Sequence, residues 1–131
     1  MQYKIIRGTK QIGGAVTEIT SNAGKKIWID FGCELPSENA STDEKLIQLM
    51  QDEASKPDAV FFTHIHGDHI GLLEFIPEGV EVFIGEIGKK MLDNINETLL
   101  GLAELPEDER TSLLKKQKIL RSSRTHFYKK L

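Results

Sequence analysis

The segment from residue 61 to residue 71 reads Phe61-Phe62-Thr63-His64-Ile65-His66-Gly67-Asp68-His69-Ile70-Gly71. It holds three of the four histidines of the 131-residue chain, and an aspartate lies among them. An apolar run over residues 59–62 precedes the histidines and is typical of a buried strand. The histidines are therefore expected where a strand gives way to a loop, which is where open α/β sheets bind their ligands.

The spacing of these side chains is that of metal ligands. Neutral imidazole is the commonest protein ligand for zinc, and carboxylate oxygen is its usual complement. His64 and His66 stand two residues apart on nearly extended chain, so both rings can point to one side. Asp68 and His69 follow after Gly67, whose backbone permits a turn. This order suits two metal ions about 3.5–4 Å apart, one for each pair. The alternative, ordinary surface or core histidines, explains such clustering poorly.

The string His64-Ile65-His66-Gly67-Asp68-His69 resembles the HxHxDH signature of the metallo-β-lactamase-fold hydrolases. The resemblance implies that His64 and His66 bind one metal ion, and that Asp68 and His69 bind a second. It also implies that Asp68 orients the bridging water or takes a proton from it, which makes Asp68 the candidate catalytic residue.

A second part of the sequence resembles the same family. A strand expected over residues 25–31 ends in Asp30-Phe31-Gly32, and the family places there an aspartate that holds the histidine loop by hydrogen bonds. Asp30 is therefore expected to support the metal ligands without binding metal itself. Residues 7–14, together with 29–32, resemble more loosely the ribonuclease J-like branch of the family. Cys33 is interpreted as a small buried apolar residue rather than as a ligand.

The apolar pattern predicts a mixed α/β protein. Strands are expected over residues 3–7, 15–20, 25–31, 59–62 and 80–84, and a turn over residues 11–14. A helix is expected to begin at Ser41, in a capping box with Glu44. Further helices are expected over residues 70–75 and 86–100 and after the acidic residues 107–109. In the helix over residues 86–100, the stripe Ile87, Met91, Ile95 and Leu99 is expected to face the core.

The resemblance also implies further metal ligands, which are not found among residues 1–131. They are a further histidine for the first ion, a bridging aspartate and a last histidine for the second ion. Only His126 follows His69, and its surroundings do not look like a ligand position at a strand end. Residues 1–131 are therefore expected to form a single incomplete domain, the N-terminal half of a metallo-β-lactamase-like αββα sandwich. An open sheet face predicts self-association, or a C-terminal half that completes the site.

Composition and charge limit the class of protein, its compartment and its partners. The chain is 39% hydrophobic and 28% charged, which is ordinary for a globular domain. No apolar run approaches the ~20 residues that cross a bilayer, and one cysteine cannot form an internal disulfide, so a cytoplasmic protein is expected. Residues 110–131 carry eight Lys or Arg and no acidic side chain. Such asymmetry can mark a nucleic-acid contact, although a solvated helix end is the favoured interpretation.

These features together predict a metal-dependent hydrolase. Two divalent ions, expected to be zinc although manganese and iron suit the same ligands, would activate a water that attacks a phosphodiester or another ester. RNA is the candidate phosphoester substrate. The first alternative is a catalytically incomplete metal-binding half-domain that acts through a partner chain. The second is an interaction module whose histidines are incidental.

Overall fold

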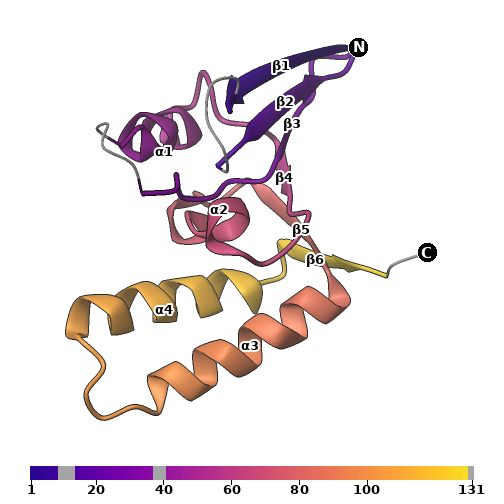
Figure 1. Cartoon of the computed structure of the whole chain (residues 1–131). Helices are drawn as coiled ribbons and strands as arrows, with labels where there is room; N and C mark the ends of the chain where they lie inside the picture. The colour runs from indigo at the N-terminus through magenta and orange to yellow at the C-terminus, as the bar shows by residue number, and fades with distance from the viewer. Residues whose placement is uncertain (9–13, 37–40, 130–131) are drawn as a thin grey trace.

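The computed structural model describes residues 1–8, 14–36 and 41–129 (Figure 1). Six strands and four α-helices occur in these residues, which confirms the predicted mixed α/β class. In chain order the elements are β1 (Gln2–Arg7), β2 (Val16–Thr20), β3 (Lys26–Ile29), α1 (Asp43–Gln51), β4 (Ala59–Phe61), α2 (Gly67–Ile70), the 3-10 helix η1 (Leu73–Phe75), β5 (Glu81–Gly85), α3 (Glu86–Leu100), α4 (Glu107–Leu120) and β6 (Thr125–Tyr128).

All six strands form one sheet, and their order in space is their order in the chain. β1, β2 and β3 are antiparallel neighbours, whereas β3, β4, β5 and β6 run parallel. The carboxyl ends of the four parallel strands therefore lie along one edge of the sheet. β6 was not predicted, because a run of four residues is too short to identify a strand even when three of them favour one, and its pairing with β5 defines it.

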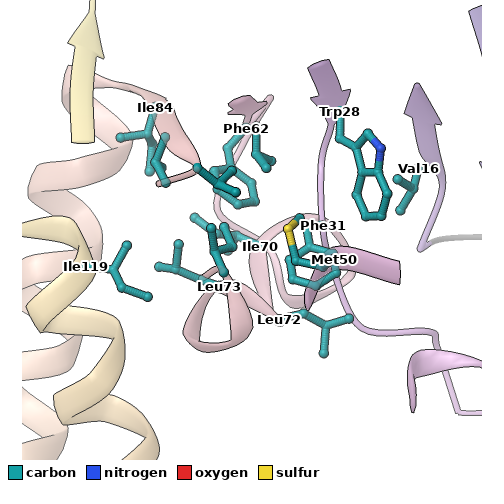
Figure 2. Packing of buried hydrophobic residues seen from close by; sticks show 14 of the residues in the cluster. Val16, Trp28, Phe31, Met50, Phe62, Ile70, Leu72, Leu73, Ile84 and Ile119 are labelled. Atoms are coloured by element: carbon teal, nitrogen blue, oxygen red, sulfur yellow. The ribbon is translucent and has the colours of Figure 1, made fainter. Parts of the chain in front are cut away.

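The core lies on one face of the sheet (Figure 2). Alternate strand residues point to this face because successive side chains of a strand lie on opposite sides. Helices α1, α2 and α4 supply the other half of the core. The buried residues labelled in Figure 2 are Val16, Trp28, Phe31, Met50, Phe62, Ile70, Leu72, Leu73, Ile84 and Ile119.

Helix α3 has the predicted bounds but not the predicted orientation. Its stripe was expected in the core, yet Ile87, Met91 and Ile95 are 69%, 49% and 46% exposed. The buried residue of the helix is instead Asn96. Periodicity shows which residues share a face of a helix, but not which face the rest of the protein covers. α3 packs on β5, β6 and α4 through its other side.

Two local predictions about helices were also wrong. The helix expected over residues 70–75 is divided into α2 and η1. The capping box at Ser41 does not form, and α1 starts after Thr42 without a side-chain cap. The carboxylate of Glu34 accepts hydrogen bonds from the Thr42 amide at 2.7 Å and hydroxyl at 3.1 Å, so a loop residue occupies these donors. The turn expected over residues 11–14 lies outside the described residues, apart from Gly14.

The two longest helices, α3 and α4, are 15 and 14 residues long. Within the described parts of the chain, no helix has the length and apolar character needed to cross a membrane.

Two methionines test the packing. Replacing the fully buried Met50 by alanine should lower the free energy of unfolding by about 2–5 kcal/mol, because the change removes apolar contacts and leaves a cavity. Replacing Met91, which is 49% exposed, should change it by less than about 0.5 kcal/mol. Urea unfolding followed by circular dichroism measures both. Equal losses would show that α3 buries its apolar stripe after all.

Candidate metal centre

The clustered histidines follow β4 at the carboxyl edge of the parallel strands. Phe62 is buried, and its amide donates to the carbonyl of Phe83 at 2.9 Å, so the chain stays attached to β5 up to this point. His64 and His66 lie in the loop after Phe62, and Asp68 and His69 lie in α2. The helix begins at Gly67, so the sequence places one pair of candidate ligands on each side of a loop-to-helix boundary.

The structure brings the three imidazole rings together. The ring centroid of His64 lies 5.0 Å from that of His66 and 3.6 Å from that of His69. The Oδ2 atom of Asp68 lies 3.3 Å from Nε2 of His69. His64 and His66 are exposed, whereas Asp68 and His69 are partly buried. The four side chains thus form an open cluster that a ligand can reach from solvent.

Asp30 supports this cluster through hydrogen bonds to Thr63 and a contact with His69. Its side chain is buried, and Oδ1 accepts a hydrogen bond from the Thr63 amide at 2.8 Å. Oδ2 accepts one from the Thr63 hydroxyl at 2.7 Å and lies 2.7 Å from Nδ1 of His69. An Nδ1–H donor on His69 leaves Nε2 free to bind a metal ion, which is the usual arrangement of a metal-binding histidine.

The backbone after Asp30 also supports the loop. Asp30 has φ of 66°, a left-handed conformation that aspartate tolerates better than most residues. The amides of Phe31 and Cys33 then donate to the carbonyls of His69 and Gly67, at 2.9 and 2.8 Å. Between them, a Cβ atom on Gly32 would lie 2.1 Å from the carbonyl carbon of Asp68. Only glycine permits this contact between two backbone segments.

Arg7 supports the same segment, a role that its place in the sequence did not predict. Its guanidinium is buried and donates to the carbonyls of Gly14 and Gly32, the former at 2.8 Å. It also forms an ion pair of 2.6 Å with Asp43 at the start of α1. β1, α1 and the Gly32 segment therefore share one cation. The one feature of the sequence that could have indicated this role is a charged residue at the end of a strand.

Tyr128 of β6 is a second residue that the sequence did not point to. Its hydroxyl donates to the carbonyl of Phe62, directly before the histidine loop. Burial, and then the nearby Asp30 carboxylate, raise the pKa of Tyr128, so its hydroxyl remains a neutral donor at physiological pH. The fourth histidine, His126, instead places Nε2 2.9 Å from the carboxylate of Glu81.

Cys33 packs against the loop without joining the imidazole cluster. Its thiol is partly buried, and a Cβ atom on Gly71 would lie 2.5 Å from the sulfur. Burial raises the pKa of Cys33, and Asp43 raises it further. A protonated thiol is a poor metal ligand, which agrees with the interpretation of Cys33 as a packing residue.

The cluster fits a zinc ion by its chemistry, because imidazole and carboxylate are the donors that zinc takes. Among the residues with a described position, however, no three His, Cys, Asp or Glu side chains are arranged to hold one ion. Catalytic zinc takes about three protein ligands and a water. The pair His64 and His66, and the pair Asp68 and His69, would each require further donors.

Comparison of the sequence with known protein families gives one match. The sequence model of the metallo-beta-lactamase superfamily matches residues 13–82. No curated protein matches the chain.

Several solved structures share the fold. AidC, a dizinc quorum-quenching lactonase, is 21% identical with a TM-score of 0.50, over 87% of this chain and 42% of its own. A protein of unknown function from Enterococcus faecalis V583 is 23% identical with a TM-score of 0.56, over 80% and 30%. The hydrolase AbOPH of the beta-lactamase superfamily is 15% identical with a TM-score of 0.52, over 88% and 42%. The chain thus spans less than half the length of each.

The contact at Gly32 predicts a strong effect of one methyl group. Gly32→Ala should lower the free energy of unfolding by about 3 kcal/mol or more, because the new Cβ atom would overlap the backbone of Asp68. Gly85→Ala is the control, since a Cβ atom there lies at an ordinary 3.7 Å from Tyr128. Urea unfolding compares the two. Similar stabilities would argue against the close approach.

The hydrogen bonds of Asp30 predict a role in metal affinity. Asp30→Asn keeps the side-chain shape and tolerates the left-handed backbone, but it removes the negative charge beside His69. Zinc affinity, measured by competition with a chelating dye, should fall about 10–100-fold. Asp108→Asn, at an exposed position in the first turn of α4, should leave it unchanged. Equal zinc affinities for the two variants would remove Asp30 from the centre.

Proposed function

Because the chain belongs to the metallo-β-lactamase superfamily, we propose that it supplies the first ligand cluster of a metal-dependent hydrolase that cleaves a phosphodiester or another ester. The supporting observation is the gathering of three imidazoles and Asp68 at the carboxyl edge of the parallel strands. Ligands of α/β proteins bind at this edge.

The proposed ligands act in two pairs. His64 and His66 would hold one divalent ion, and Asp68 and His69 would hold a second. The ions would supply an activated water and would stabilise negative charge on the substrate. Asp30 keeps the Nε2 atom of His69 free for this role through its contact at Nδ1. Asp68 lies beside His69 and is the proposed group that orients the attacking water or takes its proton.

Zinc is the proposed metal, because three of the four donors are imidazoles. Manganese and iron suit the same ligands and are the alternatives. The description of AidC as a dizinc lactonase supports this choice for a protein of the same fold.

RNA is the proposed phosphodiester substrate, as in the ribonuclease J-like branch that the sequence resembles. The basic segment after residue 109 gives this proposal limited support. Arg110 and Arg124 donate to backbone carbonyls of neighbouring loops, and Arg121 pairs with Glu97. These three cations therefore already have partners within the protein. Exposed lysines, such as Lys115 and Lys118 of α4, remain as candidate phosphate contacts.

The second candidate function is a metal-binding half-domain that acts only with a partner chain. The observation that favours it is the lack, within the described residues, of three donors arranged around one ion.

Hydrolysis of bis(4-nitrophenyl) phosphate tests the two candidates. Protein purified without a tag, stripped of metal and then supplied with zinc or manganese should hydrolyse this diester. His64→Ala should reduce the rate to that of the metal-free protein, because the variant lacks one ligand of the cluster. His126→Ala is the matched control, because this histidine pairs with Glu81.

The outcomes separate the candidates clearly. Stoichiometric metal binding without hydrolysis would favour the half-domain. Absence of metal binding by the untagged protein would contradict both functions. Equal loss of rate in the His64 and His126 variants would show that the activity does not arise at the histidine cluster.

A further inference from the structure

The side chain of Tyr128 in β6 reaches the histidine segment across the neighbouring strand. Tyr128 lies opposite Gly85 in the parallel pairing of β5 and β6. Its hydroxyl donates to the carbonyl of Phe62, the residue that follows β4. Because β5 lies between β4 and β6 in the sheet, Tyr128 links two strands that are not neighbours.

Gly85 leaves the space through which this side chain passes. A Cβ atom on Gly85 would lie 3.7 Å from Cε2 of the Tyr128 ring. That distance is an ordinary contact between carbon atoms, so an alanine would fit at this position. Side-chain atoms beyond Cβ would meet the ring. A small residue at position 85 is therefore a condition for the contact between Tyr128 and Phe62.

The Phe62 carbonyl belongs to the same peptide unit as the Thr63 amide. That amide donates to Oδ1 of Asp30 at 2.8 Å. A peptide unit is planar, so its carbonyl and its amide turn together. Asp30 follows β3 and Tyr128 belongs to β6, which place them on opposite sides of β4. One rigid group is thus held from both sides, directly before the first candidate ligand.

His64 lies between two residues that other elements hold. Before it, the Thr63 Oγ1 atom lies 3.2 Å from Nδ1 of His64, and the same hydroxyl donates to Asp30 at 2.7 Å. After it, Ile65 packs against α3, where a Cβ atom on Gly88 would lie 3.0 Å from the Cγ2 atom of Ile65. A rotation of the peptide unit before Thr63 would therefore change the direction of the His64 ring.

The other candidate ligands are held by different contacts. The carbonyl of His66 accepts hydrogen bonds from the amides of His69 and Ile70, at 2.8 and 3.0 Å, which fixes the first turn of α2. The ring of His69 contacts Asp30 directly at 2.7 Å. Tyr128 therefore acts on His64 more than on the ligands of α2.

We propose that Tyr128 is a positioning residue of the candidate metal centre, and that it sets the direction of His64 through the peptide unit between Phe62 and Thr63. Its ring spans β5, and its hydroxyl supplies the hydrogen bond. The consequence for metal affinity rests on the proposed function, in which His64 is a ligand. The hold on the peptide unit exists without metal and can be measured separately.

Tyr128→Phe tests this role, because it removes the hydroxyl and keeps the ring. In the metal-free protein, the Thr63 amide should exchange with deuterium about 3–10-fold faster by NMR, the effect of losing one neutral hydrogen bond. Zinc affinity, measured with a chelating dye, should fall by about the same factor. Tyr3→Phe is the matched control, because Tyr3 lies on β1 and is 79% exposed, and it should change neither quantity.

A pair of variants at position 85 tests the same contact while keeping the hydroxyl. Gly85→Val should displace the Tyr128 ring and should reproduce the faster exchange and the weaker zinc binding. Gly85→Ala, whose added atom fits at 3.7 Å, should behave as the unmodified protein. The amide of Val82 in β5, which donates to the Arg124 carbonyl at 3.0 Å, reports any general loosening of the sheet.

Unchanged exchange at Thr63 in Tyr128→Phe would overturn the proposal, whether or not the protein binds zinc. Equal acceleration at Thr63 and Val82 would also overturn it, because the hydroxyl would then stabilise the sheet as a whole. So would faster exchange at Thr63 with full zinc affinity. If the unmodified protein binds no zinc, the proposed function fails, and the exchange measurements alone decide the role of Tyr128.

Discussion

The candidate metal centre depends on the contacts of one buried group, the carboxylate of Asp30. A carboxylate in this position is costly unless several donors satisfy it, and Thr63 and His69 supply three. Because both residues belong to the histidine segment, the hydrogen bonds that satisfy Asp30 also fix the shape of the loop. The left-handed turn at Asp30 then directs Phe31 and Gly32 along the backbone of that loop.

The sequence predicted the parts of the structure that are encoded locally. The histidine cluster lies within six residues, and the alternating strands and the bounds of α3 follow from periodicity. The exposure of Met91 could not be predicted, because it depends on which side of α3 meets the rest of the protein. β6, and with it the position of Tyr128, depends on pairing with β5. The contacts of Arg7 with Gly32 and Asp43 join residues that are distant in the sequence, so local pattern could not predict them. The assignment of the four ligands to metal ions remains a prediction.

The candidate metal centre and the sheet are linked through the same strand. The two ligand pairs would each hold an ion with fewer donors than catalytic zinc takes, and the sheet has a core on one face alone. Phe61 ends β4 directly before the histidine loop, and it pairs with Ile29 and Phe83 on the face of the sheet that points away from the core. The strand that leads into the histidine loop therefore contributes to both faces of the sheet.

The order of the strands has a consequence for synthesis of the protein. Each strand pairs with the strand made just before it, so no strand has to insert between two that are already joined. As the chain leaves the ribosome, β1, β2 and β3 can form a meander, and each later strand can add to an edge that is already present. The sheet can thus grow in the direction of translation, which shortens the time that each new strand remains unpaired.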